Sequence, residues 1–145
     1  MAFQFPLATV LRVRGIVEER EERLLQGILF EISQTHESLA RTEAEIAGSD
    51  ALRNENVFKK CAGHNLHSAY GEVKELKQSR QALEEQIGKL VLLRDRQIAV
   101  YEGARRNREM LTDIRNNQRS IYESDAARRE QKTLDDNYIA RRGRF

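Results

Sequence analysis

Three residues near the middle of the chain carry side chains of the kind that bind a transition metal. Cys61, His64 and His67 follow one another at intervals of three, and thiolate and imidazole groups are the usual ligands of zinc. A structural zinc site needs four ligands, and no further cysteine or carboxylate with zinc-type spacing accompanies them. We therefore expect no metal site, and interpret the two histidines as exposed side chains near a turn.

Clustered carboxylates are the other candidates for chemistry, at residues 18–22 and at Asp135-Asp136. Acid–base catalysis requires a pocket that excludes water and holds such groups in place. The sequence has no phosphate-binding glycine loop, no nucleophile elbow and no His-Glu-x-x-His pattern. We expect no catalytic residue and no cofactor, so the chain is predicted not to be an enzyme.

The composition favours long helices over a layered core. Of 145 residues, 39% are hydrophobic and 33% are charged, with one proline and one cysteine. A globular domain usually has about 45–50% apolar and about 25% charged residues, whereas a two-helix seam needs apolar side chains at only about two positions in seven. The single cysteine excludes an intramolecular disulfide. No apolar run approaches the ~18 residues that span a bilayer, so we expect a cytoplasmic protein without membrane insertion.

Apolar residues recur at helical spacing in two stretches. The first predicted seam occupies positions 17, 21, 24, 28, 32, 35, 39, 42 and 46, with one stutter at 24–28–32 where two steps of four follow each other. The second contains Val73, Leu76, Arg80, Leu83, Ile87, Leu90 and Arg94, and continues less regularly through Ile98, Tyr101, Leu111, Ile114, Gln118 and Ile121. Such spacing predicts a coiled coil.

These stretches predict one all-α domain over residues 1–145, a long two-helix antiparallel coiled coil. Its helices cover about 6–60 and 67–140, with Pro6 in the first turn and a bend at about 61–66, where Gly63 suits a helix C-terminus and Asn65 an N-cap. Residues 48–50 are interpreted as a kink or a frayed site. In such a hairpin, the numbers of two residues that face each other add up to about 127. The start of the first helix at Pro6 then faces about residue 121, so the second helix extends beyond the hairpin after Tyr122. With few apolar residues, this overhang is expected to fray until a partner orders it.

The charge is distributed unevenly along the chain. Residues 1–50 have net charge −4, and residues 51–100 and 101–145 each have +3. An antiparallel hairpin places these opposite charges side by side, which favours pairing at the flanking positions. A nucleic-acid-associated coil that uses Arg105, Arg106, Arg108, Arg115 and Arg119 is an alternative, but those arginines alternate with carboxylates, and we expect no nucleic-acid partner. A purely structural, self-associating coil is a second alternative.

Two groups of residues remain for interaction or flexibility. Off-seam apolar residues are expected to form a patch midway along the coil, and they are Leu25, Leu29, Phe30, Leu92, Leu93 and Val100. Glycines inside the helices either weaken them or permit bending and close backbone approach, and these are Gly15, Gly27, Gly88 and Gly103.

The two ends of the chain carry motifs that resemble one known family. The N-terminal pattern F-x-F-x-L-x-x-V-L-x-x-R comprises Phe3, Phe5, Leu7, Val10, Leu11 and Arg14, followed by Glu18 and Glu21. The C-terminal pattern R-R-E-Q-K-x-L-D-D comprises Arg128, Arg129, Glu130, Gln131, Lys132, Leu134, Asp135 and Asp136. Together with the length and the bend, they resemble the FliJ family, small cytoplasmic proteins of the flagellar type III export apparatus.

This resemblance implies a coil similar to the central stalk of rotary ATPases. The joined ends would enter the hexameric ring of the export ATPase, and other surfaces would contact the membrane export gate and escort export chaperones at the inner face of the cell membrane. The matching ring-contact candidates are Phe3, Phe5, Leu7, Leu11, Arg128, Arg129, Lys132, Leu134 and Asp135. No family motif maps onto the middle of the coil, so the gate and chaperone candidates come from the apolar patch alone, and they are Leu25, Leu29, Phe30 and Val100.

Overall fold

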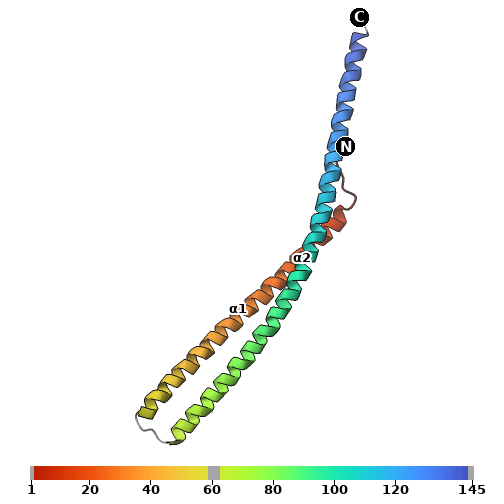
Figure 1. Ribbon diagram of the computed structural model, residues 1–145. Helices are drawn as coiled ribbons and strands as arrows, with labels where there is room; N and C mark the ends of the chain where they lie inside the picture. Colours follow the sequence, from red (N-terminus) through yellow and green to blue (C-terminus); the bar gives the residue numbers. More distant parts are fainter. Residues whose placement is uncertain (1, 59–62, 144–145) are drawn as a thin grey trace. The chain divides into compact units, whose positions relative to one another are not determined.

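Two long helices make up nearly all of the structure. The computed structural model describes the main chain of residues 2–58 and 63–143, and their side chains except at 53–58, 63–67 and 69. Helix α1 spans Ala8–Phe58 and helix α2 spans Gly63–Arg142 (Figure 1). The prediction of an all-α helical hairpin is confirmed.

The helix boundaries differ from the prediction by a few residues. Helix α2 already includes residues 63–66, among them Gly63 and Asn65, which were expected in the bend; residues 61–62 of that bend fall outside the described residues. The kink considered at residues 48–50 is absent, since α1 continues through Gly48 to Phe58. Ile46 is buried and Ser49 is half-buried on the same side of α1, so packing outweighs the helix propensity of a single glycine.

The first helix starts from a tight turn. The amide of Ala8 donates to the carbonyl of Phe5 at 3.1 Å, and the amide of Leu11 donates to the carbonyl of Leu7 at 2.9 Å. Pro6 therefore occupies the second position of a four-residue turn, where its fixed φ is favourable. Proline was expected inside the first helical turn, and it instead precedes the helix.

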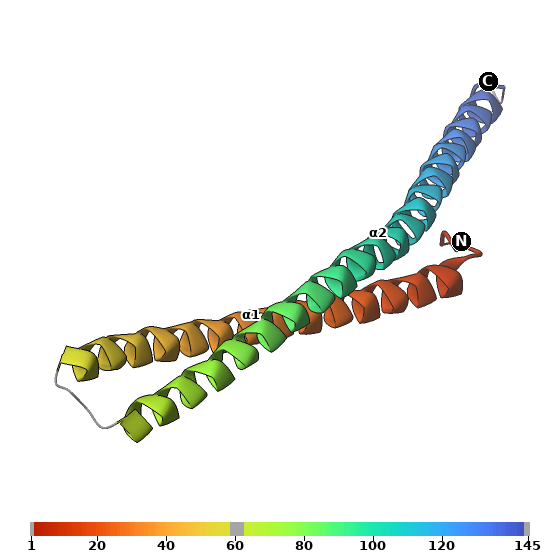
Figure 2. The same ribbon diagram turned by 60° about the horizontal axis from the view of Figure 1, so that its bottom comes forward.

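The chain divides into two compact units, which are described separately. Unit 1 contains Met1–Glu21 and Tyr101–Phe145, and unit 2 contains Glu22–Val100. In unit 2, the α1 residues Glu45 and Gly48 share a groove with Glu72 and Leu76 of α2. The two helices of this unit thus lie against each other, as the ribbon also shows (Figure 2).

The seam of unit 2 is an unbroken heptad repeat on both helices. Buried or half-buried positions alternate in steps of three and four, as expected for a left-handed coil. They are Leu25, Ile28, Ile32, Thr35, Leu39, Thr42 and Ile46 on α1, and Val73, Leu76, Arg80, Leu83, Ile87, Leu90 and Arg94 on α2. The α2 part was predicted correctly. On α1, Leu24 is exposed and Leu25 takes its place, so the predicted stutter does not occur.

The two threonines in this seam are satisfied within their own helix. The hydroxyl of Thr35 donates to the carbonyl of Glu31 at 2.8 Å, and that of Thr42 donates to the carbonyl of Ser38 at 3.0 Å. A buried hydroxyl without a partner destabilises a core, whereas one bonded four residues back does not. The threonines therefore present mainly their methyl groups to the facing helix.

The seam of unit 1 is more polar than predicted. On α2 the predicted positions Ile114, Gln118 and Ile121 are exposed. Gln118 is also a position that continues the heptad. The other such positions are half-buried, and they are Tyr101, Ala104, Arg108, Leu111, Arg115 and Tyr122. On α1 the corresponding residues are Leu11, Glu18 and Glu21. If the numbers of facing residues add up to about 127, residue 109 should lie opposite Glu18. This prediction is accurate to one position, because Glu18 bonds to Arg108.

The terminal part of α2 and the internal glycines complete the fold. Residues 123–142, called the terminal segment below, are helical throughout instead of frayed. Side-chain bonds between residues one turn apart support this helix, including Arg119 to Glu123 at 3.3 Å and Gln131 to Asp135 at 3.1 Å. A Cβ atom added to Gly15, Gly27, Gly88 or Gly103 would meet no atom within 4 Å. Close backbone approach is therefore not the reason for these glycines.

Candidate interaction surfaces

An ion pair between the helices lies inside the seam of unit 1. Arg108 donates from Nε to one carboxylate oxygen of Glu18, and from Nη2 to the other oxygen at 3.4 Å. The Glu18 side chain is 13% exposed and that of Arg108 is 34% exposed, so the pair is partly shielded from water. The hydrogen bond to Glu18 is the main cause that raises the pKa of Arg108. This bidentate geometry fixes the alignment of the two helices.

A second guanidinium belongs to the same area of α2. Arg105 donates from Nε to Glu109 at 2.9 Å, and this bond is the main cause that raises the pKa of Arg105. Arginine is protonated at neutral pH even without such partners. Both side chains therefore stay cationic throughout the physiological range.

The N-terminal ring-contact candidates are partly covered by α2. The rings of Phe3 and Tyr122 are 5.6 Å apart at an interplanar angle of 45°, a geometry typical of attractive aromatic pairs. Phe3, Phe5 and Leu11 are half-buried, and Leu7 is exposed. Tyr122 was predicted only as the last residue before the overhang. Tyr122 lies seven residues after Arg115, so the heptad repeat places both residues in the seam. This spacing was the signal that could have predicted a partly buried tyrosine.

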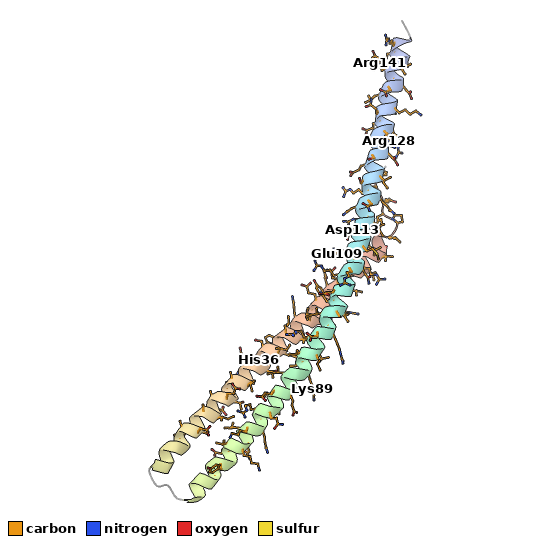
Figure 3. The ribbon with its side chains drawn as sticks, viewed as in Figure 1. His36, Lys89, Glu109, Asp113, Arg128 and Arg141 are labelled. Carbon is orange, nitrogen blue, oxygen red and sulfur yellow. The ribbon has the colours of Figure 1, made fainter. Side chains whose placement is uncertain are left out.

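The C-terminal ring-contact candidates are all exposed. Arg128, Arg129, Lys132, Leu134 and Asp135 lie in the terminal segment, and each of these side chains is exposed. Figure 3 shows the Arg128 and Arg141 side chains projecting from this part of the helix. A shallow groove there is lined by Arg129, Glu130, Thr133 and Leu134. This surface is available to a partner.

The residues predicted to form an apolar patch midway along the coil belong to unit 2, and most of them are exposed. Leu29, Phe30 and Val100 are exposed, as expected. Leu25 is half-buried because it belongs to the seam, and Leu24 is exposed in its place. On α2, Leu92 and Leu93 are also exposed. Aromatic and aliphatic side chains that remain in water are candidates for a protein contact.

No alternative chemistry is visible in the part of the chain that the structure describes. Among those residues, no three histidine, cysteine or acidic side chains are grouped to hold a metal ion. Cys61 and the side chains of His64 and His67 lie outside them, whereas His36 is exposed on α1 (Figure 3). Of the helical residues described, none form a stretch long and apolar enough to cross a membrane.

Comparisons with protein-family models, with curated proteins and with solved structures find no match to this chain. What the surfaces bind is therefore argued from their own residues and from the terminal motifs.

Proposed function

We propose that this chain is a stalk and adaptor of a flagellar type III export apparatus, which binds other proteins and performs no catalysis. The observation that supports it most is the arrangement of unit 1. Both terminal motifs belong to this unit, where Phe3 packs on Tyr122 and α2 continues beyond that contact as an exposed helix. A charged helix without a neighbour is suited to entry into a larger assembly.

The terminal segment is the proposed contact with the export ATPase ring. It offers the cations of Arg128, Arg129 and Lys132 together with the apolar side chain of Leu134, all exposed. Phe3 already packs on Tyr122. We therefore assign the ring contact mainly to α2, and assign Phe3, Phe5 and Leu11 to holding the two ends together.

The apolar patch of unit 2 is the proposed contact with the export gate and with export chaperones. Leu29 and Phe30 on α1, and Leu92 and Val100 on α2, are large apolar side chains that remain in water. Such clusters are typical anchor points of protein interfaces. This role places the protein in the cytoplasm, peripheral to the cell membrane.

A nucleic-acid role is disfavoured by the partners of the arginines on α2. Arg105 pairs with Glu109, Arg106 with Glu102, and Arg119 with Glu123, while Arg108 pairs with Glu18. Phosphate binding would have to break these contacts. A steep fall of affinity with salt in a gel-shift assay would contradict this view.

The direct test of the proposed function is an ATPase assay with the cognate export ATPase. The intact chain should raise the rate of ATP hydrolysis and promote ring assembly. Leu134→Asp should remove most of this stimulation, because a carboxylate would replace the apolar contact. Leu52→Asp is the control, since Leu52 is similarly exposed but lies on unit 2. Absence of stimulation by the unmodified chain would refute the ring role.

A further inference from the structure

The terminal segment does not continue the seam of the hairpin. If the heptad extended past Tyr122, its next seam positions would be charged, namely Asp125, Arg129, Lys132 and Asp136. A different stripe of the helix carries three apolar side chains and one glutamine. Ala127, Gln131, Leu134 and Tyr138 are spaced by four, three and four residues, which is the spacing of a two-helix seam.

This stripe is open to solvent. Leu134 and Tyr138 are each 64% exposed, and every described side chain after Ala126 is exposed. The groove beside Leu134, lined by Arg129, Glu130 and Thr133, shows that the helix surface is also hollowed at this point. The stripe therefore has the pattern of a seam without a second helix in its own unit.

The charges around the stripe identify the missing helix. From its start, the segment carries acids at 123 and 125, bases at 128 and 129, an acid at 130, a base at 132, acids at 135 and 136, and bases at 141 and 142. Reading this order backwards exchanges every sign. A second copy of the segment that runs antiparallel can therefore bring the base at 128 beside the acid at 135, and it does so from both copies at once.

Side-chain size selects the same arrangement. When two copies run antiparallel and pack their stripes as seam layers, Ala127 faces Tyr138 and Gln131 faces Leu134. Each layer then combines a small or flexible side chain with a large one, which fills space evenly. The same register brings Arg128 beside Asp135 of the second copy, twice in the dimer. In a parallel pair, Tyr138 would face Tyr138, and Ala127 would face Ala127 across a gap.

We propose that two copies of this chain associate through their terminal segments, as an antiparallel pair along the stripe of Ala127, Gln131, Leu134 and Tyr138. The interface is isologous, so one patch meets itself about a two-fold axis. It is also small, about 30 Å of helix from each copy. Such a contact makes a weak dimer that dissociates on dilution.

Self-association of this kind would hide the surface that the proposed function assigns to the ATPase ring. Leu134, Arg128 and Asp135 take part in both contacts, so one copy cannot make both at the same time. Dimerisation itself does not depend on that function. It follows from the segment alone, and it is tested with the purified chain in the absence of any partner.

Sedimentation velocity of the full chain tests the dimer over a concentration range of about 5–500 μM, which covers weak association. The unmodified chain should shift from monomer to dimer as concentration rises. Leu134→Asp should weaken dimerisation by about tenfold or more, whereas the control Leu52→Asp should leave it unchanged, because Leu52 is similarly exposed and lies on unit 2. Far-UV circular dichroism would verify that each variant stays helical. A chain that is monomeric at every concentration, or dimerises equally as Leu134→Asp, overturns the proposal.

A charge exchange tests the antiparallel register. Arg128→Asp alone should be monomeric, because acids would face acids, and Asp135→Arg alone should be monomeric for the opposite reason. An equimolar mixture of the two variants should dimerise again, because opposite charges then face each other at both pairs. If the mixture stays monomeric while the unmodified chain dimerises, the antiparallel pairing is wrong.

Discussion

Two leucines on one helix, two residues apart, allow a stringent test of the seam in unit 2. Leu90 is 7% exposed and Leu92 is 60% exposed, although both lie well inside α2. Substituting each with alanine removes the same atoms from the same helix. Any difference in the free energy of unfolding therefore measures packing and not helix propensity, which changes equally at both positions.

The expected magnitudes follow from these exposures. Burying a leucine fully stabilises a protein by about 1.5–3 kcal/mol, and deleting it from a core costs about 2–5 kcal/mol, including the cavity. Leu90 lies in a narrow two-helix seam where neighbours can collapse, so Leu90→Ala should cost about 2–3 kcal/mol. Leu92 leaves no cavity and is mostly hydrated already, so Leu92→Ala should cost about 0.5 kcal/mol or less.

Urea unfolding followed by far-UV circular dichroism measures this difference. With a slope of about 2 kcal/mol/M, a loss of 2 kcal/mol lowers the midpoint by about 1 M. The samples should be dilute, so that association does not add to stability. Equal losses for the two variants, or a larger loss for Leu92→Ala, would mean that another face of α2 meets α1, and the seam described above would be wrong.

Two further predictions concern the glycines and the ion pair. Gly27→Ala and Gly88→Ala should each raise the free energy of unfolding by about 1 kcal/mol, because alanine favours helix and the added methyl meets no atom. If either variant is instead less stable in the same urea assay, the added methyl must meet a neighbour and the reasoning is wrong. Glu18→Arg and Arg108→Glu should each lower the melting temperature, and the double variant should recover most of the loss by restoring opposite charges across the seam. Additive losses would show that the two side chains do not interact.

The hairpin and most of its seam could be predicted because periodicity alone encodes them. From Val73 to Arg94 every predicted seam position is buried or half-buried. The two seam errors have different origins. Ile114 was preferred on hydrophobicity, yet Arg115 keeps the heptad and is half-buried. Leu24 and Leu25 are equally apolar, so hydropathy could not distinguish them, and Leu25 is the one that keeps the heptad.

Tertiary partners explain what hydropathy could not predict. Glu18 lies in the seam because Arg108 faces it from the other helix, and a pair 90 residues apart has no local signature. The aromatic contact of Phe3 with Tyr122 likewise requires the register to be known first. The terminal segment was expected to fray on the basis of its few apolar residues, whereas its helix formers and one-turn bonds maintain the helix through Arg142.

The ion pair and the aromatic pair of unit 1 also determine how the two helices can slide. A heptad repeat restores its layers after a shift of seven residues, about 10 Å along the axis, so apolar layers alone tolerate slippage. Sliding one way would place Glu18 beside Tyr101 and remove its cation. Sliding the other way would offer Glu18 a new cation in Arg115, but would pull Phe3 away from Tyr122. Shear is thus opposed in both directions within this unit, and a push applied along one helix is transmitted to the other.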